Sequence, residues 1–283
     1  MTVTGKTKIV GILGDPISHT ASPRMHAAAY DALGLDFIYV PFHVKSEGLG
    51  KALDGIRNLN IVGVNVTIPH KESVIPFLDK LDPTAQKVGA VNTIVNENGI
   101  LTGYNTDGDG FCYALLHEAN FALEGKSVVV MGAGGSAKAI ANALLNQKIK
   151  SLFILNRNTD RARQLATLLS FSSCPITVLD WEDSEISDVL ASCDLVINTT
   201  PVGMAPDVDA LPIRDVSWMH SGQLICDIIY TPSVTTFLKH AKTKGAMTLN
   251  GAGMLAGQGV LAFEKFTGQT VPYAVMRREI LGA

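Results

Sequence analysis

The sequence predicts an α/β protein that contains a doubly wound parallel sheet. Short apolar runs alternate with helix-forming segments along most of the chain, which is typical of βα units. One such run, 128–131, is followed by a glycine-rich turn, 132–135, and then by a small-residue helix pattern, 136–145. A buried strand, a glycine turn and a helix start in this order are what a dinucleotide-binding domain of the Rossmann type requires.

Each small residue of this turn has a separate use. Gly132 allows the tight turn, Gly134 lets the backbone approach a pyrophosphate, and Ala137 packs the helix against the strand. The amides at the helix start then face the phosphates, where the helix dipole favours negative charge. The candidate cofactor residues of the turn are Gly132, Ala133, Gly134, Gly135, Ser136 and Ala137. The alternative is a tight βα turn in some other doubly wound protein.

Composition limits the function classes. The 283 residues are enough for two domains, and 47% hydrophobic against 17% charged residues favours a large core over disorder. A net charge of −3 without a basic, aromatic-rich stretch argues against nucleic-acid binding. The first residues contain no long apolar segment, so we expect no signal peptide, no membrane span and a cytoplasmic location. The cysteines form no CxxC pair and the histidines show no metal spacing, so we expect free thiols and no metal.

The first hundred residues are expected to form a parallel or mixed sheet, because strand and helix patterns alternate there. Pro23 should open a helix, and Asn98-Gly99 marks a hairpin turn. The expected strands are 8–13, 37–44, 61–68, 90–95 and 100–103, and the expected helices are 23–33, 49–59 and 71–81, the last interrupted by Pro76.

The remaining residues fit a six-stranded nucleotide-binding sheet with helices between its strands. The named strands are 128–131, 151–155, 176–179, 195–198 and 224–229, and the named helices are 107–119, 136–145, 160–169, 254–267 and 273–281. The glycine-rich stretch 250–253 is a candidate hinge. No linker is visible in the composition, so the boundary near Asp107 rests on motif order.

The residues after the second strand of the dinucleotide unit indicate NADP rather than NAD. An Asp or Glu there would bind the ribose 2′-hydroxyl of NAD, whereas this chain has Asn156, Arg157 and Asn158, with Arg161 one turn later. A guanidinium is suited to bidentate contact with a 2′-phosphate. The alternatives are that both arginines are solvated helix residues and that the nearby Asp160 supports NAD.

Polar clusters in the first domain favour a hydroxyl-rich substrate. They are Thr20 with Ser22, Asn65 with Thr67 on an otherwise apolar strand, and Asn92-Thr93 with Asn105-Thr106-Asp107. Buried polar side chains need partners, so each cluster either bonds the backbone or lines a pocket. Ser22 before Pro23 would also be a good helix cap.

Nine short motifs follow one another along the chain: HTASP, NVTIPHK, AVNT, NTDG, GAGGSAKA, NRNTDRA, INTTPVGM, DIIYTP and GMLAGQ. In this order they resemble the shikimate dehydrogenase family, including its quinate/shikimate paralogues. The resemblance implies an N-terminal α/β substrate domain completed by C-terminal helices (1–106 and 254–283) and an inserted NADP-binding domain (107–253). It also implies reversible NADPH-dependent reduction of 3-dehydroshikimate to shikimate in chorismate and aromatic amino acid biosynthesis. The substrate would be a polyhydroxylated cyclohexene carboxylate, and the protein a monomer or homodimer.

The resemblance assigns roles residue by residue. Lys71 and Asp107 would be the catalytic pair. The ring hydroxyls and carboxylate would be held by Thr20, Ser22, Asn65, Thr67, Asn92, Tyr230 and Gln258. The adenosine phosphate would be held by Asn156, Arg157, Asn158 and Arg161. Further cofactor contacts would come from Thr200, Ile228, Gly251 and Met254, with Ile228 and Gly251 facing the nicotinamide, although Met254 also fits a core position.

The chemistry agrees with this catalytic pair. Hydride delivery to a ketone builds negative charge on oxygen, and a protonated lysine amine can donate to it while a carboxylate holds the ammonium. His70 is a rival acid, although adjacent side chains leave an element in different directions. Thr20 replaces a usual serine, His70 a phenylalanine and Asn250 an aspartate. The alternatives are therefore a dehydrogenase of quinate or an amino analogue, using NAD or both cofactors, and a catalytically silent nucleotide-binding regulator.

Overall fold

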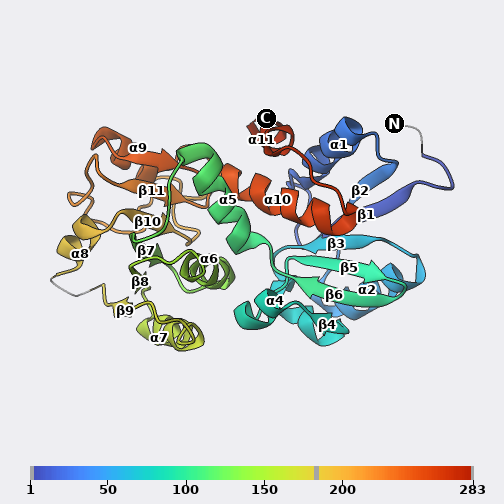
Figure 1. The fold of residues 1–283 in the computed structure, drawn as a ribbon, viewed down its shortest axis with the longest axis horizontal. Coiled ribbons are helices and arrows are strands. Elements are labelled where there is room, and N and C mark those ends of the chain that lie inside the picture. Colours follow the sequence, from blue (N-terminus) through green and yellow to red (C-terminus); the bar gives the residue numbers. More distant parts are fainter. Residues whose placement is uncertain (1–2, 182–184, 282–283) are drawn as a thin grey trace. The chain divides into compact units, whose positions relative to one another are not determined.

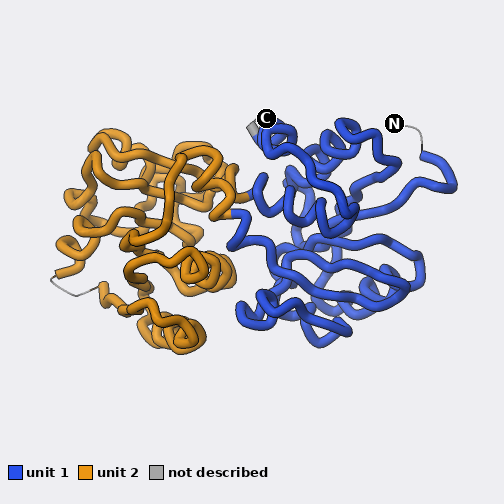
Figure 2. Tube along the Cα trace, in the orientation of Figure 1, with its two compact units in different colours: residues 1–110, 255–283 blue, residues 111–254 orange. Residues whose placement is uncertain are grey.

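The computed structural model (Figure 1) describes residues 3–181 and 185–281. The chain divides into two compact units (Figure 2): unit 1 comprises residues 1–110 and 255–283, and unit 2 comprises residues 111–254. The sequence placed these divisions at 106/107 and 253/254. Two helices, α5 (Asp107–Ala119) and α10 (Gly251–Thr267), pass from one unit into the other. No helix among the described residues has the length and apolar character needed to cross a bilayer.

Unit 1 contains a mixed six-stranded sheet in the order β2-β1-β3-β5-β6-β4. The strands are β1 (Lys8–Gly14), β2 (Phe37–His43), β3 (Gly63–Val66), β4 (Lys80–Leu81), β5 (Thr93–Glu97) and β6 (Ile100–Tyr104). β1 is parallel to β2 and β3, β5 is antiparallel to β3 and β6, and β4 is parallel to β6. The predicted mixed sheet and the hairpin at Asn98-Gly99 are confirmed.

Two hydrophobic cores lie on the two faces of this sheet. Because side chains alternate along a strand, Val10 and Ile12 of β1 join one core and Leu13 joins the other. The first core is shared with α1 (Ser22–Leu33), α10 and α11 (Tyr273–Leu281), and the second with α2 (Leu49–Asn58). The C-terminal helices therefore supply one wall of the N-terminal core, which agrees with the predicted architecture.

The predicted helix 71–81 is wrong. The segment forms α3 (His70–Ser73), the 3-10 turn η2 (Ile75–Phe77) and then β4. Pro76 lacks a backbone N–H and cannot continue a helix, and neither side of it is long enough for a stable helix of its own.

The helix α4 (Pro83–Val88) was not predicted, although its sequence carries a helix start signal. Asp82 accepts a hydrogen bond from the backbone N–H of Thr84 at 2.9 Å and is the N-cap, with Pro83 in the first turn. The predicted strand 61–68 is also too long. β3 ends at Val66, so Thr67 lies just beyond it.

Unit 2 contains an all-parallel six-stranded sheet in the order β12-β11-β10-β7-β8-β9, the doubly wound order of a dinucleotide-binding domain. The strands are β7 (Ser127–Met131), β8 (Ser151–Leu155), β9 (Ile176–Leu179), β10 (Leu195–Asn198), β11 (Leu224–Asp227) and β12 (Met247–Leu249). Val128 and Val130 face a core with α5, α6 (Gly135–Leu145) and α7 (Thr159–Leu168). Val129 and Met131 face a core with α8 (Ile186–Ser192) and α9 (Thr236–Thr243).

Three predictions in unit 2 are corrected. β12 was not located from the sequence, because Met247 and Thr248 are exposed and give no apolar run. The proline-containing connection 199–223 between β10 and β11 contains no helix. The stretch proposed as a hinge, 250–253, is not a glycine loop, since α10 begins at Gly251.

Candidate active site

Lys71 and Asp107, which are 36 positions apart in the sequence, form an ion pair. The Nζ atom of Lys71, on α3, lies 2.5 Å from Oδ2 of Asp107, the first residue of α5. The Lys71 side chain is 24% exposed and that of Asp107 is 7% exposed. An anchored carboxylate therefore holds an ammonium group that still reaches solvent. The structure brings the two residues of the predicted catalytic pair together within unit 1.

Asn92 fixes the orientation of Asp107. Its Nδ2 donates to Oδ1 of Asp107 at 2.8 Å and to Oγ1 of Thr106 at 2.9 Å, and its Oδ1 accepts from the backbone N–H of Thr106 at 2.9 Å. Asn105 adds a further bond, because its Oδ1 accepts from the backbone N–H of Asp107 at 3.1 Å. The predicted substrate residue Asn92 is itself buried. Its amide contacts within the protein are those of a group that positions Asp107.

His70 does not share the environment of Lys71. It is fully buried, and its Nε2 lies 2.6 Å from the backbone oxygen of Val44. The backbone oxygen of Lys71 accepts from the N–H of Val91 at 2.8 Å, which ties α3 to the segment before β5. The two adjacent side chains thus leave α3 in different directions, as the sequence analysis expected.

The other polar residues of unit 1 predicted to hold substrate lie on separate elements. Asn65 is buried near the end of β3, where its Nδ2 donates to the backbone oxygen of Asn92 and to Oγ1 of Thr93 at 3.1 and 3.0 Å. Thr67 fits against Gly14, where a Cβ atom would lie 2.5 Å from the threonine methyl group. Gln258, on α10, accepts a hydrogen bond at its backbone oxygen from Oγ1 of Thr106 at 3.1 Å.

The capping role suggested for Ser22 is wrong. Ser22 is the first residue of α1, the N-cap position is Ala21, and no side chain caps this helix. The backbone N–H of Ser22 instead bonds Oγ1 of Thr20 at 3.3 Å. The Ser22 side chain therefore does not cap α1, and it is buried.

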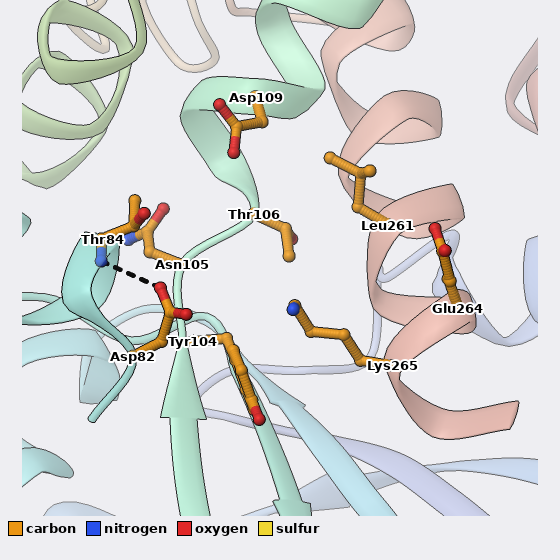
Figure 3. Close-up of a pocket in the computed structure, with 9 residues that line it drawn as sticks. All are labelled: Asp82, Thr84, Tyr104, Asn105, Thr106, Asp109, Leu261, Glu264 and Lys265. Carbon is orange, nitrogen blue, oxygen red and sulfur yellow. Dashed lines mark hydrogen bonds between the residues drawn. The ribbon is translucent and has the colours of Figure 1, made fainter. Parts of the chain in front are cut away.

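Unit 1 also contains a polar pocket of about 350 Å³ that was not predicted from the sequence (Figure 3). It includes Asn105 and Thr106 but neither Lys71 nor Asp107. Burial raises the pKa of Asp109 above its ordinary value, and the Asp82 charge acts in the same direction while Lys265 opposes it. The lining residues are Asp82, Thr84, Tyr104, Asn105, Thr106, Asp109, Leu261, Glu264 and Lys265. The pocket lacks the catalytic pair and is not the predicted substrate site.

The glycine turn of unit 2 has the form that a pyrophosphate site needs. Gly132 has φ +116°, and a Cβ atom there would lie 2.4 Å from Oγ1 of Thr199, so both its conformation and its neighbour require glycine. Cβ atoms at Gly134 and Gly135 would meet nothing within 4 Å, so space is open above the start of α6. Ala137 is fully buried in the core under the turn. Phosphate groups can therefore approach the amides at this helix N-terminus.

The residues predicted to hold the adenosine phosphate lie at the end of β8 and the start of α7. Asn158 has a structural role, because its Oδ1 caps α7 by accepting from the backbone N–H of Arg161 at 3.0 Å. Asn156 donates to the backbone oxygen of Asn158 at 2.7 Å. Asp160 is paired with Arg163 at 2.9 Å, which leaves Arg157 outside that ion pair.

Arg157 lines a pocket of about 710 Å³ in unit 2 together with Trp181 and Arg214. Sequence reasoning missed Arg214, because it lies in the irregular segment between β10 and β11 and belongs to no recognised motif. A pocket with two guanidinium groups and an indole ring is suited to a phosphorylated nucleoside.

The residues predicted for the nicotinamide end gather at the carboxyl ends of β10 and β11. Asn198, at the end of β10, accepts at Oδ1 from the backbone N–H and the hydroxyl of Thr200, and donates from Nδ2 to Oδ1 of Asp227 at 3.2 Å. Ile228 follows β11, and the N–H of Gly251 bonds the backbone oxygen of Ile229 at 3.0 Å. Ligands of doubly wound sheets bind at these strand ends.

Asp227 was not singled out from the sequence, because it ends an apolar strand and belongs to no charge pattern. It is buried, and it accepts from the backbone N–H of Ile229 at 3.1 Å and from Oγ1 of Thr235 at 2.8 Å. Burial raises its pKa to about 6, although these hydrogen bonds act in the opposite direction. It anchors the chain that carries Ile228 and Tyr230.

The last two predicted residues of unit 2 have different surroundings. Met254 is buried in the core of α5 and α6, which favours its alternative assignment as a core residue. Tyr230 is 39% exposed, and burial of the remainder of the ring raises the pKa of its hydroxyl. No group of three potential metal ligands occurs within residues 3–181 and 185–281.

Comparison with known proteins assigns the family. Three family models match the chain in order: the shikimate dehydrogenase substrate binding domain over residues 12–94, shikimate/quinate 5-dehydrogenase over 115–208, and the shikimate 5′-dehydrogenase C-terminal domain over 251–281. A shikimate dehydrogenase (NADP(+)) from Desulforamulus reducens is 46% identical over 97% of this chain and 95% of its own length. This chain belongs to the shikimate dehydrogenase family.

Solved structures of shikimate dehydrogenases share the fold. Shikimate 5-dehydrogenase from Listeria monocytogenes, in complex with shikimate and NAD, has a TM-score of 0.92 at 36% identity, over 98% of both chains. A shikimate dehydrogenase in complex with NADP+ has a TM-score of 0.90 at 38% identity, over 99% of this chain and 96% of its own. A quinate dehydrogenase from Corynebacterium glutamicum in complex with NAD has a TM-score of 0.89 at 33% identity, over 98% and 99%. Shikimate and quinate dehydrogenases thus share this fold, so the preference for a substrate and a cofactor must depend on individual side chains.

Replacing Gly251 by alanine in this shikimate dehydrogenase family member is expected to destabilise unit 2 and weaken NADP+ binding. A Cβ atom at this position would lie 1.8 Å from the backbone oxygen of Ile228, so α10 and the segment after β11 would have to separate. Overpacking of this kind costs about 1–3 kcal/mol. We expect urea denaturation to show a loss of that size and fluorescence titration to show a higher Kd for NADP+.

Gly55→Ala is the matched control. Gly55 lies in the middle of α2, where a Cβ atom would meet nothing within 4 Å, so this variant should keep or gain stability and bind NADP+ normally. Normal stability and cofactor binding in Gly251→Ala would show that the close approach to Ile228 is not required.

Proposed function

We propose that this chain is an NADP-dependent shikimate dehydrogenase that reversibly reduces 3-dehydroshikimate to shikimate, a step toward chorismate. The observation that carries the proposal is the Lys71–Asp107 ion pair. Asn92 orients its carboxylate, and the Lys71 side chain is partly exposed to solvent. NADPH, when bound, supplies the hydride, and the protein supplies position and proton transfer.

Lys71 acts as the proton donor in the reducing direction. Its ammonium group donates to the carbonyl oxygen on which negative charge develops, and in the oxidising direction its neutral amine accepts the proton of the substrate hydroxyl. Asp107 holds the ammonium with one carboxylate oxygen while Asn92 holds the other at 2.8 Å. Because Asp107 is buried and hydrogen-bonded before substrate arrives, the pair needs little reorganisation during the reaction.

Three features of unit 2 support the assignment of the NADP site to this unit. Open space above Gly134 and Gly135 leaves the first amides of α6 free for the pyrophosphate. Arg157, just before α7, and Arg161, in its first turn, are exposed and provide cations for the 2′-phosphate, and Arg157 lines the 710 Å³ pocket. Asn198 and Asp227 fix the segments of Thr200 and Ile228 for the nicotinamide end.

The substrate is assigned to the polar residues of unit 1. Thr20, Ser22, Thr67 and Gln258 supply hydroxyl and amide groups suited to a carboxylate and ring hydroxyls, and Tyr230 is a further candidate from unit 2. On this assignment residues 1–106 and 254–283 form the substrate domain, and residues 107–253 form the NADP domain.

Quinate dehydrogenase activity is the second candidate. It is favoured by the similarity to the quinate dehydrogenase of C. glutamicum and by Thr20, whose methyl group alters the candidate carboxylate site relative to serine. A catalytically silent regulator is the third reading, and the intact Lys71–Asp107 pair argues against it.

Steady-state rates for shikimate and quinate, each with NADP+ and NAD+, separate these candidates. We expect the highest kcat/KM for shikimate with NADP+, about 10- to 100-fold above NAD+, because charge-assisted bonds to the 2′-phosphate contribute about 1.5–3 kcal/mol. Arg157→Ala should reduce that ratio. Arg163→Ala removes an arginine that lies on α7 and is paired with Asp160, and it should preserve the ratio.

Two results would contradict this assignment. A higher kcat/KM for quinate with NAD+ would establish the second candidate. Binding of NADP+ without turnover of either polyol would establish the third.

A further inference from the structure

Tyr39, which belongs to no motif of the sequence analysis, is hydrogen-bonded to Asn65, a residue predicted to hold substrate. Its hydroxyl donates to Oδ1 of Asn65 at 2.7 Å. Tyr39 is on β2 and Asn65 is on β3, so this bond joins two strands of unit 1 that are not neighbours in the sheet.

The bond from Tyr39 is the start of a continuous chain that ends at the catalytic pair. Asn65 Nδ2 donates to Oγ1 of Thr93 at 3.0 Å, and that hydroxyl donates to Oδ1 of Asn92 at 3.0 Å. Asn92 Nδ2 then donates to Oδ1 of Asp107 at 2.8 Å, and the other Asp107 oxygen holds Lys71. The chain therefore runs from Tyr39 through Asn65, Thr93 and Asn92 to Asp107.

Each donor of this chain points toward Asp107. Hydrogen bonds aligned in one direction polarise one another, and their effect is strongest where water is excluded. Asn65, Thr93 and Asn92 are all at most 5% exposed, so these hydrogen bonds are shielded from bulk solvent. The negative charge of the carboxylate is the natural end of such a chain, because charged acceptors form the strongest hydrogen bonds.

The environment of Tyr39 keeps its hydroxyl a donor. Burial raises its pKa well above the ordinary value, and nearby Tyr30 acts in the same direction, while the bond from Ser22 opposes both. His26 stacks on the phenol ring with centroids 4.3 Å apart and planes 14° apart, which fixes the direction of the hydroxyl.

Resting on the proposed function, we propose that Tyr39 is a positioning residue that orients the Lys71–Asp107 pair. It acts through Asn65, Thr93 and Asn92 and need not touch the substrate. Without its hydroxyl, Oδ1 of Asn65 loses its donor, and the amide is free to rotate away from Thr93.

Tyr39→Phe is the direct test. We expect kcat/KM for shikimate to fall by about tenfold, the effect of removing one buried donor near a charge, mainly through kcat. The Kd for NADP+, measured by fluorescence titration, should be unchanged, because the cofactor residues belong to unit 2. An unaltered kcat/KM in a folded Tyr39→Phe variant would overturn the proposal.

Tyr30→Phe is the matched control. Tyr30 belongs to the same buried aromatic cluster, and its hydroxyl has no hydrogen-bond partner among the described residues. Its removal should leave kcat/KM within twofold of the wild type. A fall equal to that of Tyr39→Phe would mean that cluster packing, and not the hydrogen-bond chain, matters, and the proposal would be wrong.

Two substitutions of Thr93 test whether its hydroxyl group is needed in the hydrogen-bond chain. Thr93→Val removes the linking hydroxyl at similar shape and should reproduce the loss in Tyr39→Phe, whereas Thr93→Ser retains the hydroxyl and should retain activity. Because both losses interrupt one chain, the double variant Tyr39→Phe/Thr93→Val should be no worse than the poorer single variant. Additive losses would show two independent effects and contradict a common chain.

The outcomes separate this proposal from the proposed function. If the wild type turns over neither polyol, the proposed function fails before any variant is measured. If the wild type is active and Tyr39→Phe and Thr93→Val are also fully active, only the positioning role fails.

Discussion

Lys71→Ala is expected to lower the turnover of shikimate by about 10²- to 10⁴-fold, the range found when a general acid–base group is removed. The Nζ atom of Lys71, the proposed proton donor, lies 2.5 Å from Oδ2 of Asp107, and His70 is buried against Val44, so His70 cannot take over the role. Binding of NADP+ should be unchanged, because its candidate residues lie in unit 2. Steady-state kcat and fluorescence titration of NADP+ measure the two quantities.

Lys71→Arg separates proton transfer from electrostatics. An arginine restores a positive charge beside Asp107, but its guanidinium does not release a proton at accessible pH. We therefore expect Lys71→Arg to be nearly as slow as Lys71→Ala. Lys51→Ala, an exposed lysine on α2, is the control and should be fully active. More than a tenth of wild-type turnover in Lys71→Ala would remove Lys71 from the proton-transfer step.

The parts of the fold that were predicted correctly are those whose sequence signals are local. In unit 2, β8, β9 and β10 occupy the expected residues, because each is a short, mostly apolar run bounded by polar residues or proline. β12 was missed because it has only three residues, and two of them are exposed. In unit 1, the two-residue β4 is too short to carry a pattern, and it exists because β6 offers it a paired edge.

Some residues of the candidate site were likewise recognised from the sequence, and others were found only in the structure. Gly132 was recognised from the turn that surrounds it, and the structure adds Thr199 as a second reason for glycine. Lys71 and Asp107 came from a motif resemblance, and their contact depends on Asn92, which only the fold brings to them. Tyr39 and Asp227 were given no role from the sequence, although Asp227 begins the motif DIIYTP, because an aromatic residue in a strand and a polar residue at a strand end are common. Their importance is a matter of which donors and acceptors meet after folding.

Acidification is expected to destabilise the protein through His26. This residue is fully buried, both of its ring nitrogens lack a partner among the described residues, and burial lowers its pKa to about 3. An unfolded histidine has a pKa of about 6.5, so between these values the unfolded chain binds a proton that the folded chain does not. The free energy of unfolding therefore falls as the pH drops through 6.5, and the loss continues to about pH 3.

The size of this effect makes it measurable. At about 1.4 kcal/mol for each pH unit, the His26 contribution at pH 4 is a loss of about 3 kcal/mol relative to pH 7, and the full loss near pH 3 is about 5 kcal/mol. Asp227 acts in the opposite direction, because its pKa is raised to about 6 and its proton stabilises the folded state below that pH. Comparison of two variants at each pH cancels the Asp227 term, since neither variant alters it.

His26→Phe is the variant to compare with the wild type. A phenyl ring keeps the stacking on Tyr39 at 4.3 Å and removes the two unpartnered nitrogens. Urea denaturation at pH 7 and pH 4 should show that the variant loses about 3 kcal/mol less than the wild type between the two conditions, whatever its stability at pH 7. His240→Ala, at an exposed position on α9, should behave as the wild type.

Equal losses in His26→Phe and the wild type would show that His26 finds a partner or solvent when protonated, and the buried-histidine argument would be wrong. The result also bears on the proposed catalytic pair. His26 stacks on Tyr39, whose hydroxyl begins the chain to Asp107, so a proton on His26 places an uncompensated charge against that ring. As the pH falls far enough for His26 to be protonated, the kcat of the wild type should therefore fall. His26→Phe should keep its kcat to lower pH.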